Sequence, residues 1–299
     1  MFKNSIFILL LLSLVGPANA TIDIFACEPE WGALAGEIGG DRVSVYVATT
    51  AKQDPHLIEA RPSLLAKARK ADLLFCTGAD LELGWLPILL KKTGNRKIQP
   101  GKPGHLFAAD YVELKEVFGE VSRSMGDVHA GGNPHIHLDP RNLLPVANEL
   151  RNRLVSIDPD NQDYYQQRLQ SFDERWSAAL ARWKQDAGGL QGMPIVVHHR
   201  SWIYLEAWLG LKEIAALEPK PGSPPTAAHL AKLISLLGVQ PARVVIRSPY
   251  QDPRASKWLQ EKVEINAIML PFTVGGTPEA DNLFSLFDDT ISRLKQASQ

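Results

Sequence analysis

The chain has 299 residues, of which 32 are Lys or Arg and 33 are Asp or Glu, so its formal net charge at pH 7 is −1. A chain so close to neutral lacks the basic character that binding to a polyanion requires, and this excludes nucleic acid as a partner. The length is sufficient for two hydrophobic cores of ordinary size, which allows two domains.

Residues 1–20 have the three parts of a secretory signal peptide. Lys3 supplies the positive n-region, residues 6–15 the apolar core, and Ala18-Asn19-Ala20 the cleavage site before Thr21. Removal of this segment takes away Lys3 and leaves 31 basic and 33 acidic residues, a net charge of −2. The apolar run is too short to span a bilayer, and no Cys follows the cleavage site. We therefore expect a soluble periplasmic protein, the alternative being a buried N-terminal helix.

Short apolar runs alternate with helical patterns in the first third of the mature chain. The expected strands are residues 22–26, 43–47, 73–75 and a weaker 97–99, and the expected helices are residues 31–38, 63–70 and 81–91. Such alternation is typical of βαβ units and a parallel sheet. Residues 102–132 contain five glycines without clear periodicity and are predicted to be mostly loop. A helix over residues 141–154 closes this first lobe, which we assign to residues 21–158.

The second half repeats the plan without a repeat at the level of single residues. The expected strands are residues 195–197, 213–216, 244–246 and 267–270, and the expected helices are residues 202–209, 226–237, 253–263 and 278–295. We assign the second lobe to residues 188–299.

A long helical pattern over residues 159–187 separates the two halves. Asp158-Pro159 opens it as an N-cap and first helical residue, and neither Gly nor a further Pro interrupts it. A helix of this length spans roughly 40 Å. We predict an α/β protein of two (β/α)4 lobes joined by one long rigid helix; the alternative is an ordinary surface helix packed on one domain.

The two cysteines, Cys27 and Cys76, each follow an apolar run that is predicted to be a strand. Neighbouring parallel strands would bring the two thiols within bridging distance, and a disulfide persists in an exported protein. Two buried free thiols are an equally good alternative.

Residues 131–140 read Gly-Gly-Asn-Pro-His-Ile-His-Leu-Asp-Pro and place two imidazoles and a carboxylate close together. The two prolines exclude a helix interior, and an extended segment would turn His135, His137 and Asp139 to the same face. Imidazole is the commonest metal ligand, so the pattern indicates a metal site. An isolated His-x-His is more often a solvated loop, and the choice depends on the remaining histidines.

Histidines from three separate loops are expected at the carboxyl ends of the strands, where open α/β sheets bind ligands. His56 follows the second strand, His135 lies in the loop that closes the first lobe, and His198 and His199 follow the strand at residues 195–197. The other histidines, His105, His129 and His229, are interpreted as surface residues. Both lobes thus contribute to one candidate metal site.

These loops, in this order, resemble those of the metal-binding solute-binding proteins of zinc and manganese ABC importers. The matching segments are Asp54-Pro55-His56 with Glu59, Ala71-Asp72-Leu73 with Gly78 and Leu81-Glu82, Asn133-Pro134-His135 with Leu138-Asp139-Pro140, and His199 with Tyr204, Gly210 and Leu211. The resemblance runs from about residue 21 to 295. It implies two α/β lobes joined by one long rigid helix.

The resemblance also implies a ligand set of His56, His135 and His199. His137 and His198 fall at positions that are not ligands in the family, although a shift of one residue would exchange His198 with His199. The family often supplies an Asp before the last helix, where this chain reads Leu270-Pro271-Phe272-Thr273. Asp281 is the nearest downstream carboxylate, so the fourth ligand is Asp281, water or another group.

Three neutral imidazoles suit Zn²⁺, whereas Mn²⁺ is better served by carboxylate oxygens. The resemblance implies a periplasmic, monomeric protein, not an enzyme, that binds Zn²⁺ tightly as the transported ligand and delivers it to an ABC permease in the inner membrane. It allows a metallochaperone as a second partner. The alternatives are a manganese receptor of the same family, a receptor for an organic solute, and an exported zinc hydrolase with Glu59 or Glu218 as base. The hydrolase lacks support from a His-Glu-x-x-His motif.

Overall fold

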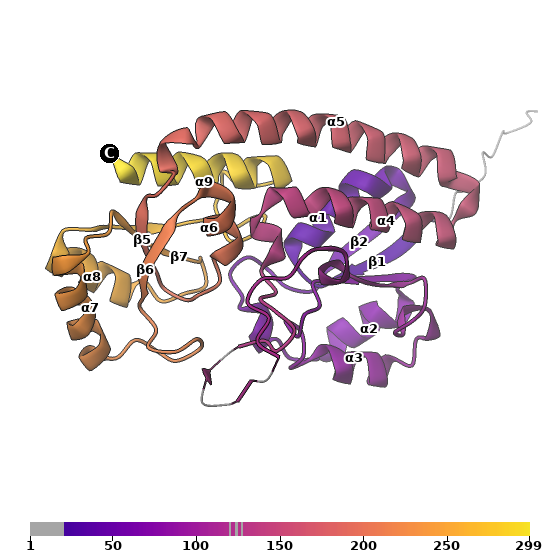
Figure 1. Ribbon diagram of the computed structural model, residues 1–299. Helices are drawn as coiled ribbons and strands as arrows, with labels where there is room; N and C mark the ends of the chain where they lie inside the picture. Colours follow the sequence, from indigo (N-terminus) through magenta and orange to yellow (C-terminus); the bar gives the residue numbers. More distant parts are fainter. Residues whose placement is uncertain (1–20, 120, 123–124, 127) are drawn as a thin grey trace, which may run out of the picture.

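The protein is described here from a computed structural model that covers residues 21–119, 121–122, 125–126 and 128–299. The predicted signal peptide, residues 1–20, lies outside the described residues. Two lobes, each with a four-stranded parallel sheet, lie side by side beneath one long helix (Figure 1). The predicted α/β class and two-lobe plan are confirmed. Within the described ranges, no helix is both long and apolar enough to cross a membrane.

The N-terminal lobe has the strand order β2-β1-β3-β4. Its strands are β1 (Ile22–Ala26), β2 (Val43–Val47), β3 (Leu73–Cys76) and β4 (His105–Phe107), and its helices are α1 (Pro29–Gly39), α2 (Pro62–Lys70), α3 (Leu86–Thr93) and α4 (Leu143–Ile157). Successive strand residues face opposite layers, so Ile24 and Phe75 pack with α1 and α4, whereas Phe25 and Leu74 pack with α2 and α3. Burial on both faces explains the nearly continuous apolar runs of β1 and β3.

The prediction of a fourth strand at residues 97–99 is wrong. The Asn95 side chain accepts a hydrogen bond from the backbone N–H of Lys97 and opens a 3₁₀ helix at Arg96–Ile98. The fourth strand is β4, which pairs with β3 and lies inside the segment that was predicted to be mostly loop. A three-residue strand is too short to show a period, and only its pairing with β3 reveals it.

Helix α3 begins at Leu86, five residues later than the sequence predicts. Pro87 lies in the first turn, where its missing N–H costs nothing, and the preceding residues Ala79 and Asp80 have φ angles of 48° and 64° that no helix allows. The apolar residues of this turn therefore belong to an irregular segment.

The C-terminal lobe has the strand order β6-β5-β7-β8. Its strands are β5 (Pro194–Val197), β6 (Lys212–Ala216), β7 (Val244–Arg247) and β8 (Asn266–Met269), and its helices are α6 (Ile203–Leu209), α7 (Ala227–Val239), α8 (Arg254–Val263) and α9 (Leu283–Ser298). All four predicted strands agree with the structure to within one residue at each end. Helix α9 starts later than predicted because Asn282 caps it, accepting the backbone N–H groups of Phe284 and Ser285.

Helix α5 (Gln162–Asp186) joins the lobes and lies along both of them (Figure 1). Its Trp176 packs on Phe172, with ring centroids 5.1 Å apart, and on Phe284 of α9, with ring centroids 4.9 Å apart. One hydrophobic cluster runs from α1 and α4 through α5 to α9 and includes strand residues of both sheets. The helix is therefore packed on both lobes rather than on one, and the two lobes share a continuous core.

Cys27 and Cys76 form a disulfide, with their Cα atoms 4.8 Å apart. They follow β1 and end β3, which are neighbouring parallel strands, and the backbone N–H of Cys27 donates to the carbonyl of Phe75. The sequence was compatible with either this disulfide or two free thiols, and the structure has the disulfide. The buried Glu82 lies beside the two sulfurs, but sulfurs bonded to each other are not thiolate ligands for a metal.

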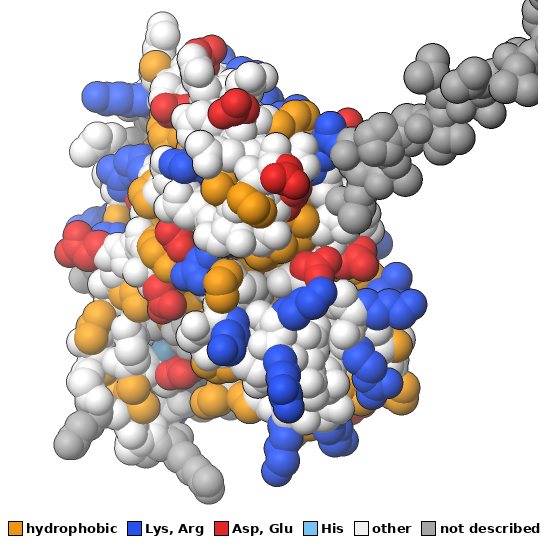
Figure 2. Space-filling model, turned by 90° about the vertical axis from the view of Figure 1, so that its right-hand side faces the viewer, with side chains coloured by type: hydrophobic (Ala, Val, Ile, Leu, Met, Phe, Trp, Pro, Cys, Tyr) orange, Lys and Arg blue, Asp and Glu red, His pale blue; other side chains and the backbone are white. Residues whose placement is uncertain are grey.

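Exposed lysines and arginines gather on one side of the N-terminal lobe, over α2, the end of α3 and the turn after it (Figure 2). They include Lys67, Arg69, Lys70, Lys91, Lys92 and Arg96. The near-zero net charge of the chain therefore conceals a positive surface on these helices.

Candidate metal centre

His56 reaches the space between the lobes from a short 3₁₀ helix, Pro55–Leu57, in the loop after β2. Asp54 caps this turn: its Oδ1 accepts the backbone N–H of His56 at 3.0 Å and lies 2.8 Å from the ring Nδ1. Burial alone would raise the pKa of Asp54, but its hydrogen bonds and charge interaction with His56 lower that pKa below the ordinary value. The carboxylate thus fixes both the turn and the ring.

His135 lies in the loop before α4 and is only 2% exposed. The Asn133 Oδ1 accepts its backbone N–H at 3.1 Å and lies 2.8 Å from its Nδ1. The amide is oriented unambiguously, because its Nδ2 donates to Glu116 Oε2 and to the carbonyl of Arg200. The hydroxyl of Tyr204, from the other lobe, donates to the Asn133 carbonyl and holds this loop in place.

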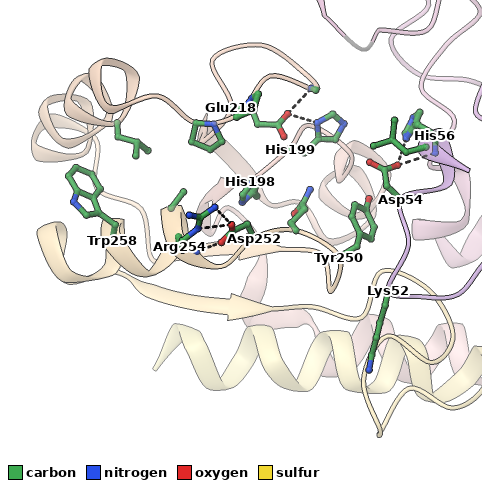
Figure 3. Close-up of a pocket in the computed structure, with 17 residues that line it drawn as sticks. Lys52, Asp54, His56, His198, His199, Glu218, Tyr250, Asp252, Arg254 and Trp258 are labelled. Carbon is green, nitrogen blue, oxygen red and sulfur yellow. Dashed lines mark hydrogen bonds and ion pairs between the residues drawn. The ribbon is translucent and has the colours of Figure 1, made fainter.

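His199 follows β5 in the C-terminal lobe. Its Nδ1 lies 2.7 Å from Glu218 Oε2, and the same oxygen accepts the backbone N–H of Gly222 at 2.8 Å. Glu218 lies two residues after the end of β6, the neighbour of β5, so the sheet itself places acceptor and imidazole together. Figure 3 shows His199 joined to Glu218 and His56 joined to Asp54, so each ring has its own carboxylate.

The three imidazoles share one tautomer. Carboxylate and amide oxygens only accept here, so each Nδ1 carries the proton and each Nε2 is the acceptor nitrogen of its ring. The Nε2 of His135 is buried and has no hydrogen-bond partner among the described residues. This is the arrangement of metal-binding histidines, in which an oxygen acceptor orients the ring and the other nitrogen faces the ion.

The spacing of the rings suits a shared ion. The ring centroids of His56 and His135 are 5.7 Å apart, and those of His135 and His199 are 6.4 Å apart. Three imidazoles bound to one tetrahedral ion at 2.0–2.1 Å have centroids roughly 5 Å apart, so each of these two separations is within about 1.5 Å of that arrangement. A cavity of about 820 Å³ opens beside His56 and His199, and one of about 390 Å³ opens beside His135 and His199.

Electrostatics keep the central ring neutral. Burial, followed by the charges of the neighbouring His56, His199, His137 and His129, lowers the pKa of His135 well below its ordinary value. A neutral imidazole is the form that binds a metal, so His135 loses no proton on binding at neutral pH.

The expectation that His137 and Asp139 point to the same side as His135 is wrong. Residues Ile136–Leu138 form a 3₁₀ helix, so the alternation of an extended strand does not apply. His137 is buried against α1, with Nε2 donating to the Phe272 carbonyl at 2.9 Å and Nδ1 lying 3.2 Å from Glu30 Oε1. Asp139 pairs with Arg141 instead.

His198 and His199 point to different sides of the chain after β5 (Figure 3). His198 lines the cavity of about 820 Å³ near Asp252 and Arg254. His105 and His229 lie outside the cluster, because their rings contact the carbonyls of Ile98 and Ala216.

His129 was interpreted as a surface residue, and the structure differs. Its Nε2 lies 3.2 Å from Nε2 of His56, and the two ring centroids are 5.3 Å apart. Sequence analysis missed this because residues 102–132 show no period that would place the side chain. The sequence feature that could have placed His129 near the other histidines was its position four residues before Asn133, in the same loop as His135.

Asp281 is held at the start of α9, where its carboxylate accepts from Asn282 Nδ2 and Ser285 Oγ. In the segment Leu270-Pro271-Phe272-Thr273, which stands where the family often has an Asp, Phe272 packs edge-on against His135, with ring centroids 5.4 Å apart. An apolar ring therefore covers this side of the candidate site.

A family model described as "Zinc-uptake complex component A periplasmic" (ZnuA) matches residues 24–297. The chain belongs to this family. It is similar to the zinc-binding lipoprotein AdcA of Streptococcus pneumoniae, with 23% identity over 88% of this chain and 53% of that relative. It is also similar to the manganese ABC transporter substrate-binding lipoprotein scaA of Streptococcus gordonii, with 26% identity over 60% of this chain and 59% of the relative. The chain thus spans somewhat more than half the length of these curated relatives.

Solved structures show the same fold. A crystal structure of ZnuA superposes with a TM-score of 0.78 and 24% identity, covering 93% of this chain and all of that one. Zn(II)-bound AdcA from Streptococcus pneumoniae superposes with a TM-score of 0.73 and 20% identity, covering 94% of this chain and 58% of that one. The two lobes and the helix that joins them are therefore the fold of this family.

Proposed function

We propose that this chain is a periplasmic zinc-binding protein that captures Zn²⁺ with His56, His135 and His199 and delivers it to the permease of an ABC importer in the inner membrane. The observation that carries the proposal is the common orientation of the three rings. Each Nδ1 is held by an oxygen of Asp54, Asn133 or Glu218, which leaves three Nε2 atoms for one ion.

Zinc is the expected cargo rather than manganese. The carboxylates nearest the rings, Asp54 and Glu218, already accept from imidazole nitrogens, so the ligand set offers nitrogen rather than the oxygen that Mn²⁺ prefers. The names of the relatives include both zinc and manganese proteins, so the family alone does not select the metal.

The two lobes have different parts in binding. His56 and His135 come from the N-terminal lobe and His199 from the C-terminal lobe, so an ion bound by all three joins the lobes. Release to a permease requires that this link be broken, which a small movement of the loops accomplishes without unfolding either sheet. A metallochaperone as metal donor and a monomeric state belong to the same proposal.

Titration of the metal-free mature protein, residues 21–299, with Zn²⁺ and with Mn²⁺ tests the proposal, with a chelator of known affinity as competitor. We expect one tightly bound Zn²⁺, a higher melting temperature with zinc, and a large loss of affinity in His56→Ala, His135→Ala and His199→Ala. His229→Ala is the matched control and should bind as the wild type does. Tighter binding of Mn²⁺ would select the manganese receptor, and no response to either metal would refute the metal site.

A further inference from the structure

The positive surface of the N-terminal lobe carries charge that the rest of the chain does not share. Residues 61–102 hold nine basic and three acidic side chains, a net charge of +6. The rest of the mature chain, residues 21–60 and 103–299, holds 22 basic and 30 acidic side chains, a net charge of −8. The molecule is therefore strongly polarised, although its overall charge is close to zero.

Nearby carboxylates neutralise little of this charge. Glu82 is buried, with 2% exposed, and Asp72 Oδ1 accepts a hydrogen bond from Lys97 Nζ at 2.6 Å. Within the described part of the chain, Lys97 is the only basic residue of the segment 61–102 that forms a salt bridge. The exposed cations that remain on the positive surface are Lys67, Arg69, Lys70, Lys91, Lys92 and Arg96. Their charges face solvent.

The fold brings the cations of two helices together. Helices α2 and α3 cover the face of the sheet that lies away from α5 (Figure 1). Both helices connect parallel strands, so they run in the same direction and their last turns lie at the same end of the layer. Five of the six cations lie in these last turns, and Arg96 follows in the 3₁₀ helix after α3. Cations at these positions also complement the helix dipoles.

Large apolar side chains are exposed beside the cations. Ile88 is 48% exposed and lies one turn before Lys91 and Lys92 on the same face of α3. Leu83, just before α3, is 65% exposed, and Leu57 is 79% exposed. The indole Nε1 of Trp85 donates to the carbonyl of Pro55 at 3.1 Å, which ties the segment of Leu83 to the turn that carries Leu57. One side of the lobe therefore combines cations with exposed apolar groups.

The shape of this surface fits an extended partner better than a small anion. The cations lie on the outer sides of two helices, and the cavities of about 820 and 390 Å³ are lined by other residues. Four of the six cations are lysines, which act as point charges on flexible stems and demand no fixed geometry of their partner. Spread cations beside exposed apolar side chains are the features with which peripheral proteins bind an anionic bilayer.

We propose that the positive surface binds anionic lipid headgroups and holds the protein against a membrane. The inference goes beyond the proposed function and does not depend on it, because none of the six cations lines the cavities beside the candidate metal site. For a protein that delivers metal to a permease, such binding would keep it close to its partner.

Cosedimentation of the mature protein, residues 21–299, with lipid vesicles tests the inference. We expect binding to vesicles that contain phosphatidylglycerol, weakening as salt is added, and none to vesicles of phosphatidylcholine alone. Each lysine near an anionic surface contributes about fivefold to the affinity, so the double variant Lys91→Gln, Lys92→Gln should bind about 25-fold more weakly. The matched control is Lys257→Gln, Lys262→Gln, which removes the same charge from exposed positions on α8 and should bind as the wild type does.

The absence of binding to phosphatidylglycerol vesicles would overturn the inference, and so would an equal loss in the control variant. Stronger binding to soluble polyglutamate than to the vesicles would assign the surface to an acidic protein instead of lipid. Equal melting temperatures establish that both variants fold. These measurements need no metal, so a failure here leaves the zinc titrations of the proposed function unaffected, and a failure of those titrations leaves vesicle binding unaffected.

Discussion

We predict that the oxygen atoms that accept hydrogen bonds from the imidazole Nδ1 atoms contribute differently to zinc affinity, according to how deeply each imidazole is buried. Glu218 orients His199, whose side chain is 12% exposed and borders a cavity of about 820 Å³. In Glu218→Ala, water can replace the lost acceptor, so zinc binding should weaken by about tenfold, or ~1.4 kcal/mol. Asn133 orients His135, which is only 2% exposed. In Asn133→Ala the buried Nδ1–H is left without an acceptor, and the loss should approach about a hundredfold, or ~2.7 kcal/mol.

Glu218→Gln separates orientation from charge. The Gln oxygen can still accept from Nδ1 of His199 and from the N–H of Gly222, so this variant should lose less affinity than Glu218→Ala. Competition titrations against a chelator measure all three variants, with Glu261→Ala, an exposed glutamate on α8, as the matched control. A loss in Glu218→Ala that equals or exceeds the loss in Asn133→Ala would refute the reasoning from burial.

Two further predictions concern stability and motion. Burial, followed by repulsion from Glu213 and Glu116, raises the pKa of Glu206 from 4.5 to about 8. Between these two pH values the carboxyl is protonated in the folded state and charged in the unfolded state. The contribution of the protonated carboxyl to stability is complete below about pH 4.5 and is lost as the pH rises to about 8. The free energy of unfolding of Glu206→Gln should therefore exceed that of the wild type by on the order of 3 kcal/mol at pH 8, and the two should not differ in this way at pH 4.5. Urea unfolding at both values checks this, and parallel pH dependences would contradict it. Helix α5 is packed on both lobes, so solution scattering should give nearly equal radii of gyration with and without zinc, whereas a large change would exclude a stiff connection.

Local pattern in the sequence determined most of the fold. Seven of the eight strands were predicted from the sequence. Four of them, β1, β3, β5 and β7, show the nearly continuous apolar run that burial on both faces demands. The candidate positions of His56, His135 and His199 also followed from the sequence, because the carboxyl ends of parallel strands meet at one edge of a sheet. The long helix α5 between the lobes was also predicted from the sequence, because its helical pattern is not interrupted by Gly or Pro.

Tertiary structure alone decided the rest of the candidate site. The 3₁₀ turn at Ile136–Leu138 sends His137 into the core beneath α1, whereas an extended strand would have turned it to the same face as His135. Glu218 reaches His199 because β6 pairs with β5, and His129 reaches His56 across 73 residues of sequence. Such contacts depend on where a loop without period is anchored, and that is set by pairing and packing with distant residues rather than by the residues of the loop itself.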